Sequence, residues 1–524
     1  MSQLGLDAST INRVRGMAGN IVDDLAPLLK KHTTVTVERA VLRLMGLDGA
    51  NEDEVPYPNV MVNHLMPVLS SGAAYPVAAG LLRHNTDLSS LAKMVDAKEV
   101  DLTGPLGVPE AEVAQFAAEL AAEGLGRIRE KVTERNEMLR AYPDRSQPWL
   151  YVIVATGNIY EDVEQAKAAA LKGADIVAVI RTTGQSLLDY IPYGPTTEGF
   201  GGTYATQANF RIMRAALDEV SRETGHYVRL VNYASGLCMP EIVVSGAFER
   251  LDMMLNDSMY GILFRDINPI RTFVDQYFSR VINAAAEIII NTGEDNYLTT
   301  ADAVESAHTV LASDLINEAF GHRSGLKPEL LGLGHAFEMN PEIEDGFLME
   351  LAQAMMIREI FPGSPLNFMP ATKFMSGDIF KGYIMNTMFN LAGIWTGQGI
   401  QLLGMLTEAM HTPFIQDRYL ALQNAQYVMN NARHLADAVE IKKDGPIGVR
   451  ARDVLNETDR FLKEIEGEGL LEAIRRGWFA DIKRTVDGGK GLSGVLEKEP
   501  SYANPFIGPL GEMVGIGTEI SKWM

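Results

Sequence analysis

Residues 150–180, LYVIVATGNIYEDVEQAKAAALKGADIVAVI, decide the fold of this chain. Two short apolar runs, Leu150–Ala155 and Ile176–Ile180, flank an Ala- and Glu-rich segment whose apolar residues recur at helical spacing. Short β-branched runs of this kind are typical of buried strands, and a helix between two of them is typical of a parallel crossover. The stretch therefore predicts a βαβ unit in a parallel sheet.

The same alternation continues toward the C-terminus. Further strands are predicted at Val228–Val231, Leu251–Leu255, Glu287–Ile290, Leu330–His335, Leu366–Met369 and Ile400–Leu403, with helical segments between them. The last three rest on weaker apolar runs. Together with the first two they make eight strands, which fit a closed (β/α)8 TIM-type barrel better than an open sheet.

Helical segments precede and follow this α/β region. Residues 1–147 read as a helical N-terminal region, with the clearest helix at Glu110–Asn136. Residues 148–413 form the predicted barrel, and residues 414–524 read as a helical C-terminal region with a Gly-rich tail at Asp487–Gly494. The predicted architecture is a TIM-type barrel with helical additions at both ends.

Composition limits the classes of protein to which this chain can belong. The chain has 524 residues, a formal net charge of −22 and a single cysteine, Cys238. The acidic balance argues against a nucleic-acid partner, because phosphate binding needs a basic surface. One cysteine allows no disulfide framework, which favours a cytoplasmic setting, and a buried thiol is the expected state of Cys238. No apolar run reaches the length of a membrane span, and the histidines show no metal-binding spacing.

The loop after the second predicted strand is typical of an anion site. In a parallel barrel the active site lies at the carboxyl ends of the strands. Here RTTGQS places Arg181 directly at a strand end, followed by Thr183, Gly184, Gln185 and Ser186. An arginine fork and backbone N–H groups exposed by a glycine suit a phosphate. Ser235, after the neighbouring strand, can converge on the same phosphate, although an ordinary capped loop with a surface arginine explains the pattern too.

Other strand ends carry candidate ligands of an amino acid or an aromatic cofactor. Tyr260 can stack on a cofactor ring, or it can be a core aromatic. Arg265 and Asp266 can bind a carboxylate and an ammonium, or they can form a structural ion pair. Asp295 is a plausible ammonium ligand, and Lys373 follows the seventh strand. A GxSxG elbow, a P-loop and the Asp-x-His-x-x-Gly pattern of a cobalamin lower ligand are all absent from the sequence.

Long, unusual strings across nearly the whole chain resemble the α subunits of lysine 5,6-aminomutases. They are KHTTVTVERA (31–40), YVIVATGNIYED (151–162), AVIRTTGQSLLDYIPYG (178–194), TTEGFGGTYATQ (196–207), SGLCMPE (235–241), YGILFRDIN (260–268), NTGEDNYLTTADA (291–303), GLGHAFEM (332–339) and LLGMLTEAMHTPF (402–414).

The resemblance implies an isomerase of the lysine fermentation and degradation type. In this family a TIM barrel binds pyridoxal phosphate (PLP) at its mouth. A smaller β subunit with a Rossmann-like domain holds adenosylcobalamin and supplies the lysine that binds the PLP aldehyde. A radical reaction then moves the terminal amine of D-lysine or L-β-lysine from C6 to C5. A hetero-oligomer of α2β2 type is the expected assembly.

The resemblance also assigns roles to residues. It implies that Arg181, Ser186 and Ser235 bind the PLP phosphate and that Tyr260 stacks on the pyridine ring. Asp295 would meet the substrate's α-ammonium group, and Arg265 is the candidate for its carboxylate. Lys373 is the candidate lysine near the seventh strand, although Asn367 lies close by where the family can carry a lysine.

Three other interpretations stay open at the level of sequence. An aminomutase of the same superfamily can act on another diamino acid such as ornithine, since pocket length decides the substrate. A non-catalytic barrel can serve as a scaffold subunit. A cobalamin-linked methyltransferase barrel would need no PLP. The polar set at the strand ends disfavours the scaffold, because a degenerate barrel has no reason to keep it.

Overall fold

A computed structural model describes residues 3–181, 185–199, 201–233, 236–294, 297 and 303–524. Its centre is a parallel sheet whose strands are β2 (Trp149–Ile153), β3 (Ile176–Arg181), β4 (Arg229–Tyr233), β5 (Met253–Leu255), β6 (Ile289–Asn291), β7 (Leu331–Gly332), β8 (Gly334–His335), β9 (Asn367–Phe368) and β10 (Ile400–Leu402). Their spatial order is β7-β6-β5-β4-β3-β2-β10-β9-β8.

The sheet closes into a barrel through one residue. β7 pairs with β6, β8 pairs with β9, and only Leu333 separates these two short segments. The Leu333 carbonyl accepts a hydrogen bond from the Asn367 amide at 2.8 Å, so the segments act as one strand. The fold predicted from the sequence is therefore confirmed, including the three weaker strands.

Side-chain alternation sorts the strands into an inner and an outer face. The inner face holds one apolar cluster, formed by Trp149, Tyr151, Ile153, Ala155, Ile176, Ala178, Val231, Met253, Ala336, Met369, Ile400 and Leu402. Outward residues such as Leu230 and Ile290 belong to a larger cluster shared with the surrounding helices. The barrel interior is thus a packed core, and ligands are left to its mouth.

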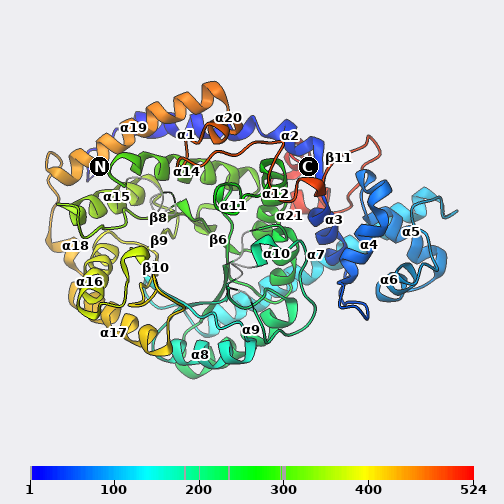
Figure 1. Ribbon diagram of the computed structural model, residues 1–524, viewed down its shortest axis with the longest axis horizontal. Coiled ribbons are helices and arrows are strands. Elements are labelled where there is room, and N and C mark those ends of the chain that lie inside the picture. Colours follow the sequence, from blue (N-terminus) through cyan, green and yellow to red (C-terminus); the bar gives the residue numbers. More distant parts are fainter. Residues whose placement is uncertain (1–2, 182–184, 200, 234–235, 295–296, 298–302) are drawn as a thin grey trace.

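Helices form a ring around the strands (Figure 1). They are α8 (Ile159–Leu171), α9 (Gln207–Thr224), α10 (Met239–Ala247), α12 (Pro269–Ala285), α14 (Ala303–Arg323), α15 (Gly346–Ile360), α16 (Ile379–Trp395) and α17 (Ile415–Ala432). A short helix, α11 (Tyr260–Arg265), precedes α12. α17 begins just beyond residue 413 and packs against both α16 and α8.

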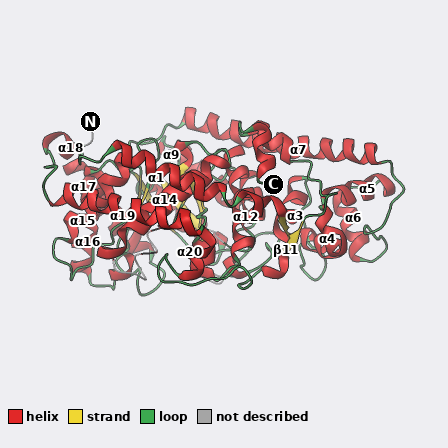
Figure 2. Cartoon of the chain, turned by 90° about the horizontal axis from the view of Figure 1, so that it is seen from above, coloured by secondary structure: helices red, strands yellow, loops and turns green. Residues whose placement is uncertain are grey.

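The N-terminal region contributes α1 (Ala8–Asp23), α2 (Ala26–Lys31), α3 (Val35–Leu44), α4 (Tyr57–Leu65), α5 (Ala74–His84), α6 (Leu88–Asp96) and α7 (Glu110–Ala141). The C-terminal region contributes α18 (Leu435–Ala438), α19 (Pro446–Glu468), α20 (Leu470–Arg476) and α21 (Ile507–Met513). α1 and α19 pack on each other and on α14. In Figure 2 the long helix α7 runs along one face of the molecule.

A short antiparallel ladder joins the two ends of the chain, where the sequence predicts helices only. β1 (His32–Thr34) pairs with β11 (Val495–Glu497). Three-residue strands leave no alternation to detect, so this pairing was missed. A single hydrophobic cluster runs from α1 through the barrel helices to α21, and the boundaries at residues 147 and 413 stay predictions. Among the described helices, no single one is long and apolar enough to cross a membrane.

Candidate active site

The loops after β3 and β4 touch at the barrel mouth. The Leu237 amide donates to the Ser186 carbonyl oxygen at 3.1 Å. A Cβ at Gly236 would lie 2.4 Å from the Ser186 Cα, so only glycine permits this approach. Ser186 is buried. The convergence of two neighbouring strand ends, expected from the sequence, is therefore present in the described parts of these loops.

Gln185 fixes the first of these loops to the chain that follows it. Its side-chain amide accepts from the Ala205 amide at 2.7 Å and donates to the Ala205 carbonyl at 3.2 Å. Both functional atoms of the side chain are thus used inside the protein. From this side chain the loop gains rigidity, a requirement for any site that must hold a ligand in one place.

Several predicted residues lie outside the part of the chain that the structure describes. Arg181 ends β3, but only its backbone is described. Thr183, Gly184, Ser235 and Asp295 fall among the undescribed residues. Their predicted roles remain predictions.

Tyr260 and Arg265 form a pair on α11. Tyr260 is buried, with 7% of its surface exposed. Arg265 donates from Nη2 to the Tyr260 hydroxyl at 2.9 Å, and its guanidinium lies 5.1 Å from the ring centroid. The Arg265 Nε is buried without a partner among the described residues. This arginine therefore keeps hydrogen-bonding capacity, which suits a carboxylate ligand.

Asp257 sets the position of that pair, and sequence reasoning missed it. The carboxylate accepts from the Met259 and Tyr260 amides at 2.7 and 2.8 Å, and from the Gly293 amide at 3.0 Å. Asp257 thus binds the amides at the start of α11 and ties this helix to the loop after β6. The signal was an aspartate three residues before Tyr260, a common capping spacing.

Two inward-facing asparagines add polar groups to the barrel lumen. Both side-chain polar atoms of Asn291, on β6, are buried with no partner among the described residues. The Oδ1 of Asn367, on β9, is in the same state. Buried polar atoms without partners are rare in folded proteins and call for an explanation, of which a ligand is one.

Lys373 lies on the loop after β9, across the barrel from α11 in strand order. Its Nζ is 3.1 Å from the Glu338 carboxylate, and 37% of the lysine side chain is exposed. Burial raises the pKa of Glu338, and the lysine charge opposes that rise. Nearby, burial raises the pKa of Glu350 to about 7, although its Oε1 accepts from the Phe337 amide at 3.0 Å.

Two other residues at strand ends have structural roles. Cys238 is buried, as expected, and burial raises the pKa of its thiol, so the thiolate nucleophile is disfavoured. His335 faces outward, where its Nε2 lies 2.8 Å from the Gln398 amide oxygen. Burial lowers the pKa of His335 to about 3, which keeps the ring neutral.

Comparisons with a protein-family model and with individual proteins point to the same family. A family model described as the D-lysine 5,6-aminomutase TIM-barrel domain of the alpha subunit matches residues 4–508. The chain is 56% identical over 508 residues to the lysine 5,6-aminomutase alpha subunit of Acetoanaerobium sticklandii, covering 97% of this chain and 98% of that protein. It is 53% identical over 510 residues to the same subunit of Fusobacterium nucleatum, covering 97% and 98%.

A more distant relative has a different length. The chain is 28% identical over 377 residues to the D-ornithine 4,5-aminomutase subunit beta of Acetoanaerobium sticklandii. The match covers 70% of this chain but 51% of that relative. The matched part of this chain therefore corresponds to about half of that longer relative.

Proposed function

The chain belongs to the family of lysine 5,6-aminomutase alpha subunits, and from this premise we propose that it is the PLP-binding subunit of an adenosylcobalamin-dependent enzyme. The proposed reaction moves the terminal amine of D-lysine or L-β-lysine from C6 to C5. The single observation that carries the proposal is the contact between the loops after β3 and β4, next to the strand that leads into Tyr260.

The described residues fit a phosphate-bearing pyridine ring. Gly236 and Ser186 approach so closely that a side chain at Gly236 would be excluded, which leaves backbone and hydroxyl groups at the predicted phosphate position. Tyr260 follows the next strand in the sheet and offers an aromatic face. In this proposal Arg181, Thr183, Gly184, Ser186 and Ser235 hold the phosphate end. Gln185, whose side chain is bonded to Ala205, contributes by its backbone and by fixing the loop.

The protein's own residues would bind and orient the reactants. PLP, when bound, supplies an aldehyde that captures the amine and a ring that delocalises an unpaired electron, and adenosylcobalamin supplies the radical. Tyr260 would keep the ring in one plane and exclude water from one face. Arg265, held by the Tyr260 hydroxyl, would bind the substrate carboxylate. Asp295 and Lys373 would meet the other polar groups of the substrate.

A partner chain is part of the proposal. The alpha-subunit relatives imply a second subunit, and the ornithine relative is about twice as long as its matched region. We assign the cobalamin to a Rossmann-like domain on that partner, in an α2β2 assembly. The single cysteine of the chain favours a cytoplasmic location. Lysine is favoured over ornithine as substrate because identity is 56% to the lysine enzyme and 28% to the ornithine enzyme.

The test is reconstitution of the purified complex with the partner subunit, PLP and adenosylcobalamin. D-Lysine should be converted to 2,5-diaminohexanoate, and omission of any one component should abolish the product. D-Ornithine in the same mixture is the matched substrate control. Conversion of ornithine but not of lysine would contradict the substrate assignment, and turnover without PLP would contradict the cofactor.

A further inference from the structure

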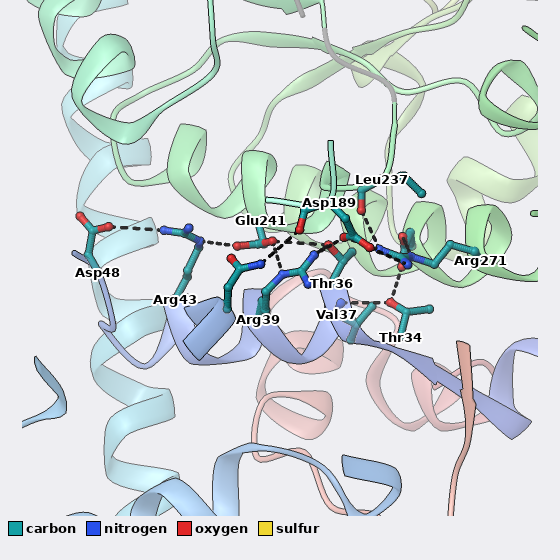
Figure 3. Close-up of polar contacts among 12 residues, drawn as sticks. Thr34, Thr36, Val37, Arg39, Arg43, Asp48, Asp189, Leu237, Glu241 and Arg271 are labelled. Atoms are coloured by element: carbon teal, nitrogen blue, oxygen red, sulfur yellow. Dashed lines mark hydrogen bonds and ion pairs between the residues drawn. The ribbon is translucent and has the colours of Figure 1, made fainter. Parts of the chain in front are cut away.

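A network of charged side chains, most of them buried, lies beside the loops after β3 and β4 (Figure 3). Arg39 and Arg43, both on α3, donate to the two oxygens of Glu241 on α10 at 2.6 and 2.7 Å. On the other side, Arg271 on α12 donates from Nε to Asp275 at 2.7 Å. Elements from the N-terminal region and the barrel thus meet in one cluster of ion pairs.

Asp189 is the residue that joins the two halves of this network. Its Oδ1 accepts from the Arg39 Nη2 and, at 2.9 Å, from the Arg271 Nη2. Its Oδ2 lies 3.3 Å from the Arg271 Nη1. Burial alone would raise the pKa of Asp189, but the guanidinium groups of Arg271 and Arg39 hold it below its usual range. The side chain is therefore charged and bridges two nearly inaccessible arginines, which are 3% and 0% exposed.

This junction is directly attached to the predicted phosphate loops. Asp189 follows Ser186 after only two residues, Leu187 and Leu188. Arg271 also donates from Nη2 to the Leu237 carbonyl at 2.9 Å, and the Leu237 amide is the group that bonds to Ser186. One guanidinium therefore contacts both loops.

The C-terminal tail also contacts Arg271. Arg271 Nη1 donates to the Gly491 carbonyl at 3.2 Å. A Cβ at Gly491 would lie 2.5 Å from the Leu237 side chain, and one at Gly494 would lie 2.4 Å from the Arg271 Nη1. The glycines of the tail let its backbone pack tightly on the arginine.

We propose that Asp189, through Arg39 and Arg271, is a positioning residue that sets the spacing of the two phosphate-binding loops. The helical additions at both chain ends would then serve the cofactor site as well as the stability of the fold. This inference rests on the proposed function, because it assumes that these loops bind the PLP phosphate. Asp189 itself touches neither cofactor nor substrate in this account.

The test compares four variants of the complex for binding of PLP and of pyridoxal, which lacks the phosphate. Asp189→Asn keeps the shape of the side chain but removes its charge. Asp218→Asn is the matched control, since Asp218 also lies between two arginines, Arg214 and Arg250, away from the mouth. Arg181→Ala tests the phosphate assignment itself. Melting temperature is measured on each variant.

Asp189→Asn should lower the ratio of PLP affinity to pyridoxal affinity by about fivefold, the order of effect of a residue that acts through its neighbours. Asp218→Asn should lower the melting temperature and leave that ratio unchanged. An unchanged ratio in Asp189→Asn, with a reduced one in Arg181→Ala, overturns the positioning role alone. An unchanged ratio in Arg181→Ala overturns the phosphate assignment. Arg39→Lys, which keeps the charge but loses the planar fork, should shift the ratio in the same direction.

Discussion

Asp252 at the amino end of the barrel and Asn291 at its mouth are buried polar residues in opposite states. At the amino end, Asp252 accepts from Arg135, Arg214, Tyr227 and the Leu230 amide at 2.8–2.9 Å. At the mouth, Asn291 has no partner for either side-chain atom within the described chain, and neither has the Oδ1 of Asn367. Asp252 is thus saturated with internal bonds, although the Nη1 of Arg250 in the same region is buried without a partner among the described residues, while Asn291 keeps capacity for a ligand.

This difference separates stability from function. The amino end does contain a cavity of about 580 Å³, lined in part by Arg135, Arg229 and Asp252, but the charges of these residues are already paired within the protein. A ligand there would have to break existing bonds. TIM-type barrels commonly use the amino face for stability and the carboxyl face for chemistry, and the bonding pattern of this barrel follows that division.

The largest effect is expected at the amino end, from Asp252→Ala. It leaves the buried charge of Arg135 without a carboxylate and leaves Arg214 with Asp218 alone. Removal of one partner of a buried ion pair typically costs about 3–5 kcal/mol. Chemical denaturation should show that loss, while PLP affinity of the folded protein stays within about twofold. A variant of normal stability, or one with selectively weakened PLP binding, would break the separation between the two ends.

Glu350, near the mouth, should respond to pH in the opposite sense to Asp252. Burial raises the pKa of Glu350 to about 7, so the stability that this group contributes is full at acidic pH and is lost as pH rises toward 7. In the parent protein, this titration should lower the free energy of unfolding by about 3 kcal/mol between pH ~4.5 and pH ~7. Glu350→Gln, whose side chain does not ionise, should not show that loss.

Asp252 supplies the comparison for that pH series. Burial opposes its ionisation, but Arg214 and Arg135 keep its pKa lowered, so its contribution is present at neutral pH and lost as pH falls below the usual aspartate range. The free energy of unfolding is to be measured from pH 4 to 8 for Glu350→Gln and for the parent protein. As pH rises, the variant should gain stability relative to the parent, because only the parent loses the contribution of Glu350. Parallel curves would show that Glu350 titrates normally.

Tyr260 tests the mouth directly. Loss of the ring in Tyr260→Ala should reduce turnover by about a hundredfold, since displacement of reacting groups by about 1 Å costs on that order. Tyr260→Phe keeps the ring but releases Arg265, so it should raise the KM for D-lysine more than it lowers kcat. A large fall in melting temperature with normal turnover per folded enzyme would make Tyr260 a core aromatic only.

Lys373 should give the smallest effect, because it is partly exposed and already paired with Glu338. Lys373→Met should raise the KM for D-lysine by about tenfold or less, the lower part of the range for a charge-assisted bond. Lys373→Arg, which keeps the positive charge, is the control. An unchanged KM in both variants would leave the lysine as a counter-ion of Glu338.

Much of this barrel could be predicted from periodicity, since runs such as Leu150–Ala155 carry an unambiguous pattern. The pairing of His32–Thr34 with Val495–Glu497 could not, because it joins residues more than 460 positions apart through backbone bonds alone. Local spacing also placed the candidate loop at Arg181–Ser186. Local spacing does not predict the role of Asp189, because its partners Arg39 and Arg271 come from distant segments.

The most direct measurement is an experimental structure of the complex with PLP bound. We expect the phosphate at the junction of the loops after β3 and β4, in contact with Arg181, Ser186 and Ser235, and the pyridine ring against Tyr260. A phosphate bound at the amino end of the barrel, or at the mouth on the Lys373 side, would contradict this expectation.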